Sequence, residues 1–192
     1  MKKHQVKDGW IIWEPNFIEE NEANKLLDHF LSNLNWESGE IKLFGKTYQI
    51  PRKQIYFADQ GMDYHYSGKK LSTNKWDSEV NQLKIKLEKV LGIDFNACLA
   101  NLYRNGEDSN GWHADNEKEL GENPTIASIS FGTTRKFQLK HQDKEEKLSY
   151  SLPHGSLLVM GGAMQHYWKH TIPKQKNIDK ARVNLTFRKI KV

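Results

Sequence analysis

His113 and Asp115 are the residues whose types and spacing most clearly allow chemistry, in the run Trp112-His113-Ala114-Asp115. At the end of a strand, residues i and i+2 point to the same side, so both side chains could reach one metal ion. Two histidines and one carboxylate on one face of an octahedron form the site of non-haem Fe(II) oxygenases. For the pair alone, however, a surface histidine beside a surface aspartate is the favoured explanation. A third ligand has four candidates, namely His141, His154, His166 and His170.

The run from 182 to 188 is the second feature with chemical potential. As a strand it alternates, with Arg182, Asn184, Thr186 and Arg188 on one face and Val183, Leu185 and Phe187 on the other. If the polar face looks into a barrel, two buried arginines need anionic partners, because an unpaired buried cation is costly. A dicarboxylate cosubstrate would supply them, since arginine binds carboxylates in a bidentate manner. An outward-facing polar stripe on a half-exposed strand is the equal alternative.

Two amphipathic helices are predicted in the first half of the chain. In the first, apolar residues recur at helical spacing after Pro15, and Asn16 and Glu19 suit its N-cap and N3 positions. The second covers roughly 76–91 and ends at Gly92. Its inward-facing residues are expected to be Val80, Leu83, Leu87, Val90 and Leu91.

Short strands separated by turn residues fill the rest of the chain. An alternating stretch from 40 to 50, with Gly45 near its middle, predicts a β-hairpin whose tip is 43–46. Further strands are predicted at 98–103, 125–131, 136–141, 147–152, 156–160, 168–172 and 182–188. The expected fold is α+β, with a double-stranded β-helix (jelly-roll) core buttressed by the N-terminal helices. We expect a single domain over 1–192, with helices and a nucleotide-recognition hairpin in 1–97 and the catalytic core in 98–192.

Composition limits the functional classes without choosing among them. The chain has 192 residues, enough for one domain with a real core, and a net charge of +5 that suits a polyanionic partner. Cys98 is the single cysteine, lies in an apolar run, and is expected to be a buried core residue. No apolar stretch approaches the length of a membrane span and no signal peptide is evident. We therefore expect an intracellular monomer without membrane contact.

Taken together, several motifs resemble the AlkB family over nearly the whole chain from Lys42 to Ile190. The motifs are Asn101-Leu102-Tyr103, His113-Ala114-Asp115, residues 154–160, His170 and residues 182–188, in the family's order. The resemblance implies Fe(II) held by His113, Asp115 and His170. It also implies that 2-oxoglutarate is held by Asn101, Tyr103, Arg182, Asn184, Thr186 and Arg188. Arg182 is expected on the distal carboxylate and Arg188 near the metal-bound end.

The same resemblance implies the oxidative removal of alkyl groups from nucleic-acid bases, closest to the branch that repairs double-stranded DNA. The expected lesions are 1-methyladenine and 3-methylcytosine, with etheno adducts as a further class, and formaldehyde is released from methyl groups. A base must leave the helical stack to reach buried iron. The implied substrate-binding residues are Phe44 and Gly45 at the hairpin tip, Arg52, Tyr64, Tyr66, Asn116 and Glu117.

Other functions stay open at the level of the sequence. The same chemistry could act on RNA, on single-stranded DNA or on a protein side chain. A nucleic-acid-binding module with a vestigial site would not explain the complete ligand set. The expected partner is DNA, double-stranded in the first place, with RNA as the alternative. The expected compartment is the cytoplasm or nucleoid of a bacterium, or the nucleus of a eukaryote.

Overall fold

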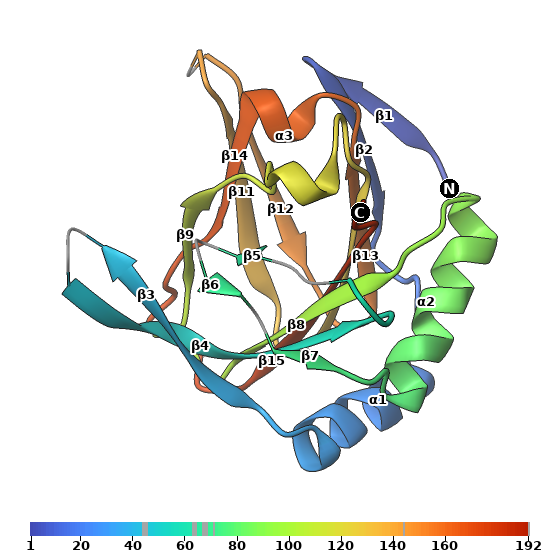
Figure 1. Ribbon diagram of the computed structural model, residues 1–192, viewed down its shortest axis with the longest axis vertical. Helices are drawn as coiled ribbons and strands as arrows, with labels where there is room; N and C mark the ends of the chain where they lie inside the picture. Colours follow the sequence, from blue (N-terminus) through green and yellow to red (C-terminus); the bar gives the residue numbers. More distant parts are fainter. Residues whose placement is uncertain (44–45, 63–64, 67–68, 71, 144, 192) are drawn as a thin grey trace.

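The computed structural model describes residues 1–43, 46–62, 65–66, 69–70, 72–143 and 145–191, without the side chains of 41–47 and 63–70. Most of the chain forms two facing β-sheets (Figure 1). The larger sheet consists of β1 (Lys3–Val6), β2 (Gly9–Glu14), β3 (Glu37–Leu43), β4 (Lys46–Ala58), β7 (Thr73–Asn74), β8 (Ala97–Tyr103), β10 (Ile126–Gly132), β13 (Ser156–Gly161) and β15 (Arg182–Arg188). Its strand order is β1-β2-β13-β10-β15-β8-β4-β3, and β7 pairs with β4 beside this path.

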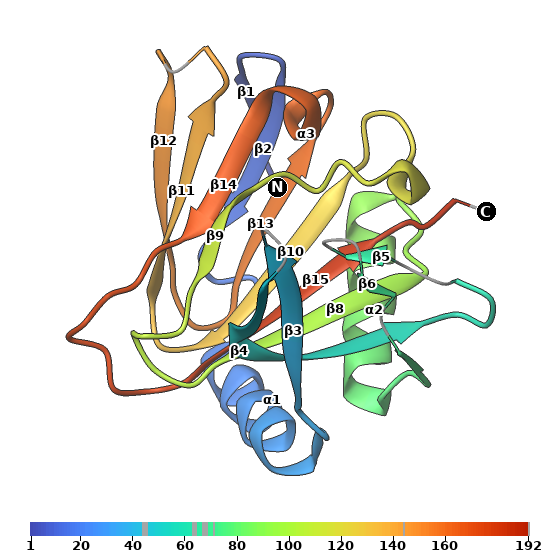
Figure 2. The same cartoon turned by 60° about the vertical axis from the view of Figure 1, so that its left-hand side comes forward.

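The smaller sheet closes the other side of the core. It consists of β9 (Asn110–His113), β11 (Arg135–His141), β12 (Lys147–Leu152) and β14 (Trp168–Ile172), in the order β12-β11-β14-β9 (Figure 2). A separate two-stranded ribbon joins β5 (His65–Tyr66) to β6 (Lys69–Lys70). The predicted jelly-roll core is confirmed, and all seven strands predicted from 98 onward are present within about one residue of their expected ends.

The inner core lies between the two sheets. Leu99 and Tyr103 from β8 pack there with Phe137 and Leu139 from β11 and with Ile172 from β14. Cys98 is buried on the opposite face of β8, and burial raises the pKa of its thiol, as expected for a core residue without chemistry.

Two helices cover the outer face of the larger sheet (Figure 1). They are α1 (Glu20–Asn33) and α2 (Ser78–Leu91). Phe30 of α1 and Leu83 of α2 belong to one buried cluster with Val183 and Phe187 of β15. The apolar face of β15 is therefore packed against the helices, and its polar face must point into the space between the sheets.

Two details of the predicted helices are wrong. The first helix begins at Glu20, with Glu19 in the N-cap position and no side-chain cap, so Asn16 does not cap it. Val90, expected inward, is 49% exposed because the apolar stripe of α2 runs through Val80, Leu83 and Leu87. Gly92 does end this helix, with a left-handed φ of 66° and its N–H bonded to the carbonyl of Glu88.

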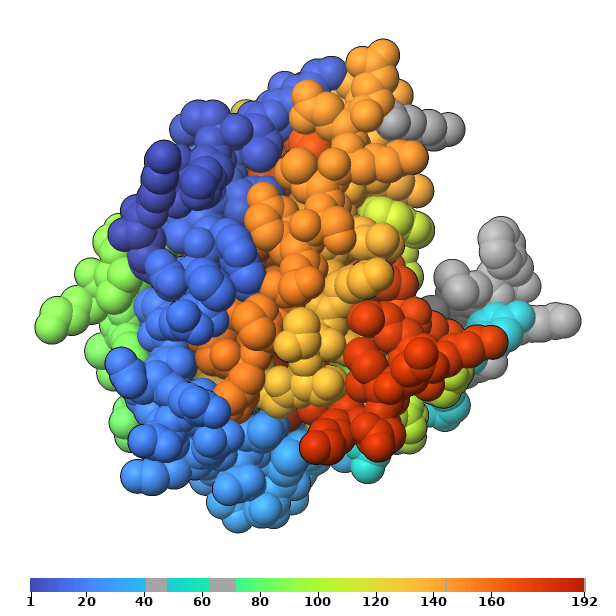
Figure 3. Space-filling view, turned by 180° about the vertical axis from the view of Figure 1, so that it is seen from behind, coloured from blue at the N-terminus to red at the C-terminus, as the bar shows by residue number. Residues whose placement is uncertain are grey.

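Three strands of four or more residues were absent from the sequence prediction, as were the two-residue strands β5, β6 and β7. The N-terminal strands β1 and β2 extend the larger sheet, because β2 pairs with β13. On the back of the molecule this N-terminal segment lies against β11 and β12 (Figure 3). There Lys7 pairs with Asp143, and Asp8 accepts a hydrogen bond from His141 at 2.8 Å. The third is β9, a four-residue strand that carries His113.

The predicted β-hairpin is confirmed as the antiparallel pair β3–β4, with Glu40 opposite Gln49 and Leu43 opposite Lys46. Its tip, Phe44-Gly45, lies outside the described residues, and its role as a lid stays a prediction. Because β4 also pairs with β8, the larger sheet runs across the expected division at residue 97. Within the described ranges, no helix has the length and apolar character that a membrane crossing requires.

Candidate active site

A group of two histidines and one aspartate lies between the two sheets. His113 ends β9, Asp115 follows two residues later, and His170 stands on β14 directly opposite His113. The potential ligand atoms of the three all lie within 4.8 Å of one another, and the two imidazole rings are 4.2 Å apart. Of the four candidate histidines, His170 is thus the one that completes the site.

Hydrogen bonds present the correct atoms to a metal ion. The Nδ1 atom of His113 donates to the carbonyl of Gly111 at 2.7 Å, which leaves its Nε2 atom as the ligand. Oδ2 of Asp115 accepts from Nη2 of Arg188 at 2.8 Å. Oδ1 of Asp115 is buried and has no hydrogen-bond partner among the described residues, and it lies 4.0 Å from Nε2 of His113. A buried carboxylate oxygen aimed at two imidazoles is the donor set that Fe(II) prefers, so the residues fit this metal.

Electrostatics keep these groups in their ligand forms. Burial lowers the pKa of His113, and together with the neighbouring His113 it lowers the pKa of His170 to about 3. Burial alone would raise the pKa of Asp115, but Arg188 and the two histidines outweigh it and lower that pKa to about 2. At neutral pH the histidines are neutral and the aspartate is ionised, as metal coordination requires.

A buried glutamine holds the segment that carries Asp115. Gln165 lies on the short helix α3 (Met164–Tyr167), and its Oε1 atom accepts from the backbone N–H of Asp115 at 2.9 Å. Its Nε2 atom faces the sulfur of Met160 at 3.8 Å. His166, the neighbouring residue and one of the four candidate ligands, is exposed to solvent. The contact to Asp115 therefore comes from the adjacent amide.

The polar face of β15 is buried, which excludes the outward-facing alternative. Arg182 is 0% exposed, and its Nη2 atom donates to Ser130 at 2.8 Å and to Asn184 at 2.9 Å. Its Nε and Nη1 atoms are buried and have no hydrogen-bond partner among the described residues. Burial lowers the pKa of Arg182 to about 10, which still leaves it charged at neutral pH. A buried cation with two unused donors is suited to an anionic ligand.

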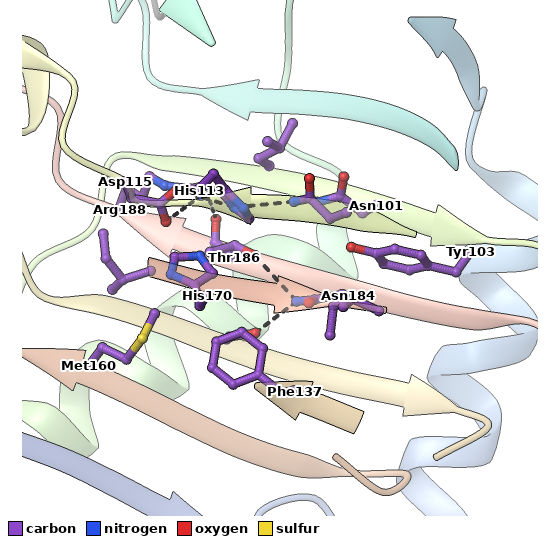
Figure 4. Close-up of a pocket in the computed structure, with 15 residues that line it drawn as sticks. Asn101, Tyr103, His113, Asp115, Phe137, Met160, His170, Asn184, Thr186 and Arg188 are labelled. Atoms are coloured by element: carbon purple, nitrogen blue, oxygen red, sulfur yellow. Dashed lines mark hydrogen bonds and ion pairs between the residues drawn. The ribbon is translucent and has the colours of Figure 1, made fainter. Parts of the chain in front are cut away.

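Most of the residues predicted for metal and cosubstrate line one cavity (Figure 4). Those lining it are Asn101, Tyr103, His113, Asp115, His170, Asn184, Thr186 and Arg188. Arg182 lies directly behind this lining, with its guanidinium 5.2 Å from the ring of Tyr103 and bonded to Asn184. Arg188 is beside the metal ligands and Arg182 is six residues away along the strand, so the two cations are at opposite ends of the site.

A third buried arginine, Arg135, supports the end of the cavity near Arg182. It is fully buried and donates to the backbone carbonyls of Asn105, Asp108 and Pro173 at 2.8–3.0 Å. Its guanidinium is 5.6 Å from the ring of Tyr103, so Tyr103 has both Arg135 and Arg182 as neighbours. These bonds join two loops that close this end.

The structure describes the residues predicted to bind substrate less completely than those predicted to bind metal and cosubstrate. Asn116 is exposed and Glu117 half-buried, directly after Asp115 at the start of a short 3-10 helix (Lys118–Leu120). Phe44, Gly45 and Tyr64 lie outside the described residues, and of Tyr66 only the backbone in β5 is described.

The prediction that Arg52 binds substrate is wrong. Binding of the nucleic-acid substrate requires an exposed guanidinium, but Arg52 is 5% exposed. It donates to Asn101 and to the carbonyl of Ser109, because its strand β4 is paired with β8 in the core.

The sequence contains little that could have revealed the supporting residues. Arg135 and Gln165 are single polar residues without a spacing pattern. The only available signal was alternation, since Arg135 shares the inward face of β11 with Phe137 and Leu139.

Comparisons with known proteins agree with this geometry. The sequence model of the family described as the 2OG-Fe(II) oxygenase superfamily matches residues 11–188 of this chain. A solved structure titled as that of OsALKBH1 superposes with a TM-score of 0.63 at 14% identity, covering 93% of this chain and 97% of the other. An oxidoreductase of the 2OG-Fe(II) oxygenase family from Burkholderia pseudomallei has a TM-score of 0.61 at 13% identity, with 93% and 84% covered. At these identities the two structures support the fold.

Curated relatives are closer in sequence. The chain is 36% identical to the DNA oxidative demethylase ALKBH2 of Bos taurus, over 88% of this chain and 65% of the relative. It is 36% identical to the alpha-ketoglutarate-dependent dioxygenase alkB homolog 3 of Homo sapiens, over 92% and 64% respectively. The alignments thus span slightly under two thirds of these two relatives, and 69% of human ALKBH2, again at 36% identity. With the family model matched from 11 to 188 and the metal triad in place, the chain belongs to the 2OG-Fe(II) oxygenase superfamily and, within it, to the AlkB family.

Proposed function

We propose that this protein is an Fe(II)- and 2-oxoglutarate-dependent dioxygenase that oxidatively demethylates alkylated bases in DNA. The observation that carries the proposal is the cavity that joins the triad of His113, Asp115 and His170 to the buried polar face of β15. The names of the relatives supply the substrate class, since ALKBH2 is called a DNA oxidative demethylase.

In this proposal the triad holds Fe(II) through Nε2 of His113, an oxygen of Asp115 and the imidazole of His170. The bound metal and 2-oxoglutarate supply O₂-dependent oxidation of a C–H bond, coupled to conversion of the cosubstrate to succinate and CO₂. Arg182 binds the distal carboxylate through its two unused donors. Asn101, Tyr103, Asn184 and Thr186 line the route from there to the metal, where Arg188 keeps Asp115 ionised.

The protein's remaining task is to bring the methyl group of the base into this cavity and to exclude water. Hydroxylation of an N-methyl group gives a hemiaminal, which breaks its C–N bond to release formaldehyde and the repaired base. We assign Asn116 and Glu117 to the exocyclic amine of the base, because they directly follow Asp115. A carboxylate at Glu117 favours the cationic lesions 1-methyladenine and 3-methylcytosine over neutral etheno adducts.

Double-stranded DNA is the proposed form of the substrate. The net charge of +5 suits the phosphate backbone, and the tip of the β3–β4 hairpin, Phe44-Gly45, resembles the apolar finger of the double-strand branch. An apolar wedge replaces the stacking that is lost when a base leaves the duplex. Tyr64 and Tyr66 are assigned to the displaced base.

The test of the activity is mass spectrometry of a duplex oligonucleotide with one 3-methylcytosine, incubated with enzyme, Fe(II) and 2-oxoglutarate. We expect the mass to fall to that of the unmodified duplex, with formaldehyde and succinate formed in equal amounts. Reactions without 2-oxoglutarate, or with His170→Ala, should leave the lesion intact. Succinate formation with an unchanged lesion would refute the base-repair activity while retaining the dioxygenase.

The duplex preference has its own test in Phe44→Ala. Flipping a base out of a duplex costs a few kcal/mol, and single strands impose little of this cost. We expect the variant to lose repair on double-stranded DNA much more than on a matched single strand. If the ratio of the two rates does not change, single-stranded DNA or RNA is the better substrate.

A further inference from the structure

Two buried side chains of β4 converge on one oxygen of the candidate cosubstrate pocket. Oδ1 of Asn101 accepts from Nε of Arg52 at 2.8 Å and from Nε2 of Gln54 at 2.9 Å. Gln54 stands directly opposite Asn101 in the antiparallel pair β4–β8. The three side chains are at most 8% exposed, so water competes little for these bonds.

The chemistry of arginine determines which way both amides point. A guanidinium has only donors, so the atom of Asn101 that faces Arg52 must be its oxygen. That oxygen is an acceptor, so the atom of Gln54 that faces it must be the amide nitrogen. The remaining end of the Asn101 amide is Nδ2, which takes no part in these two bonds and is the end left for a ligand. Asn101 lines the cavity with His113 and Arg188.

We propose that Arg52 and Gln54 are positioning residues that orient the amide of Asn101, so that its NH₂ group donates to a carboxylate of 2-oxoglutarate. The inference rests on the proposed function, in which Asn101 faces the cosubstrate. A reversed amide would be unfavourable on both sides. Its oxygen would face the anionic carboxylate, and its NH₂ group would face the donors of Arg52 and Gln54, which would then be buried without an acceptor.

Strand β4 of the β3–β4 hairpin thereby has a second role. Gln54 and Arg52 belong to the same strand as Lys46 at the base of the hairpin tip, yet they act in the core. Gln54 is the more informative of the two to change, because it carries no charge and its loss leaves the electrostatic potential of the pocket intact.

The test measures binding of 2-oxoglutarate to the Mn(II)-loaded protein by isothermal titration calorimetry, since Mn(II) replaces Fe(II) without oxidation. Gln54→Met keeps the length of the side chain and removes the donor. We expect the dissociation constant for 2-oxoglutarate to rise about fivefold, the equivalent of one ordinary hydrogen bond. The affinity for Mn(II) alone should stay unchanged. The matched control is Gln49→Met, the same substitution at an exposed position of β4, which should bind 2-oxoglutarate as the wild type does.

A double-mutant cycle with Asn101→Leu separates positioning from a general structural effect. Asn101→Leu should weaken 2-oxoglutarate binding, and adding Gln54→Met to it should cause no further loss, because no amide is left to orient. An equal loss in both backgrounds, or a parallel loss of Mn(II) affinity in Gln54→Met, would overturn the inference. If Asn101→Leu itself binds 2-oxoglutarate normally, the role of Asn101 in the proposed function is wrong instead.

Discussion

Replacing Arg182 by methionine should separate the stability of the protein from its affinity for cosubstrate. Arg182 is fully buried at one end of the cavity, with Nε and Nη1 lacking partners among the described residues. In the absence of an anion, the wild type therefore keeps a partly unsatisfied cation in its core. Methionine fills a similar volume without this cost, although Ser130 and Asn184 lose one donor each.

The structure allows both effects to be estimated. Unsatisfied buried donors cost about 1–3 kcal/mol, and each lost hydrogen bond about 0.5–1.5 kcal/mol, so the two terms nearly cancel in Arg182→Met. We expect its free energy of unfolding without ligand to differ from the wild type by less than about 2 kcal/mol. Removing one partner of a buried ion pair costs about 3–5 kcal/mol, which corresponds to a loss of 2-oxoglutarate affinity of more than about 100-fold.

The assay is thermal unfolding of the Mn(II)-loaded protein with and without 2-oxoglutarate. At a concentration about 100 times the wild-type Kd, the ligand stabilises the wild type by about 2.7 kcal/mol. For a chain of this length, that raises Tm by roughly 5–11 °C. Arg182→Met should show a rise of about 1–2 °C at most. Arg104→Met, at an exposed arginine outside the cavity, should keep the full shift. A wild-type shift in Arg182→Met would refute the assignment of Arg182 to the distal carboxylate.

Three further predictions follow from the site and its surroundings. The three metal ligands are His113, Asp115 and His170. Alanine at any of them should abolish Mn(II) binding in calorimetry while the protein stays folded, whereas the His166→Ala variant should bind Mn(II) normally. Gln165→Leu should weaken Mn(II) binding about tenfold, because it frees the backbone of Asp115, and normal binding would show that the loop is held by other contacts. Burial lowers the pKa of His141, but hydrogen bonds to Asp143 and Asp8 outweigh it, so the net shift is upward from 6.5. The stability that His141 contributes is therefore fully present below pH 6.5 and is lost as the pH rises through its folded pKa. The Tm difference between wild type and His141→Gln should be largest in acid and shrink toward alkaline pH; a constant difference would argue against this titration.

Local patterns in the sequence were sufficient to predict the core strands. They were also sufficient to identify His113 and Asp115 as a pair that could bind one metal ion. The seven strands from 98 onward follow from alternation and turn residues, because each strand has one face toward the core and one away from it. The N-terminal strands were missed because the run Gly9–Glu14 contains two tryptophans and two isoleucines without alternation. This pattern arises because β2 lies inside the sheet and contributes Ile11 and Ile12 to opposite faces.

Local sequence patterns were not sufficient to choose the third metal ligand. His-x-Asp determined that His113 and Asp115 could act together, since residues two apart share a side of a strand. Four histidines remained as partners, and only the pairing of β14 with β9 places His170 opposite His113. Strand pairing joins residues 57 positions apart in the chain, and no local spacing records it.

By itself, the sequence determined which side chains share a face, because the period of a strand is a local property. It therefore identified the alternating arginines of β15 as a pair that would need an anion if they were buried. Only the tertiary structure decided that they are buried, since that depends on α1 and α2 covering the opposite, apolar face of the strand. The structure also shows that Arg52, which was predicted to bind substrate, is instead a buried hydrogen-bond partner of Asn101. That outcome depends on the pairing of β4 with β8, a contact between segments almost 50 residues apart.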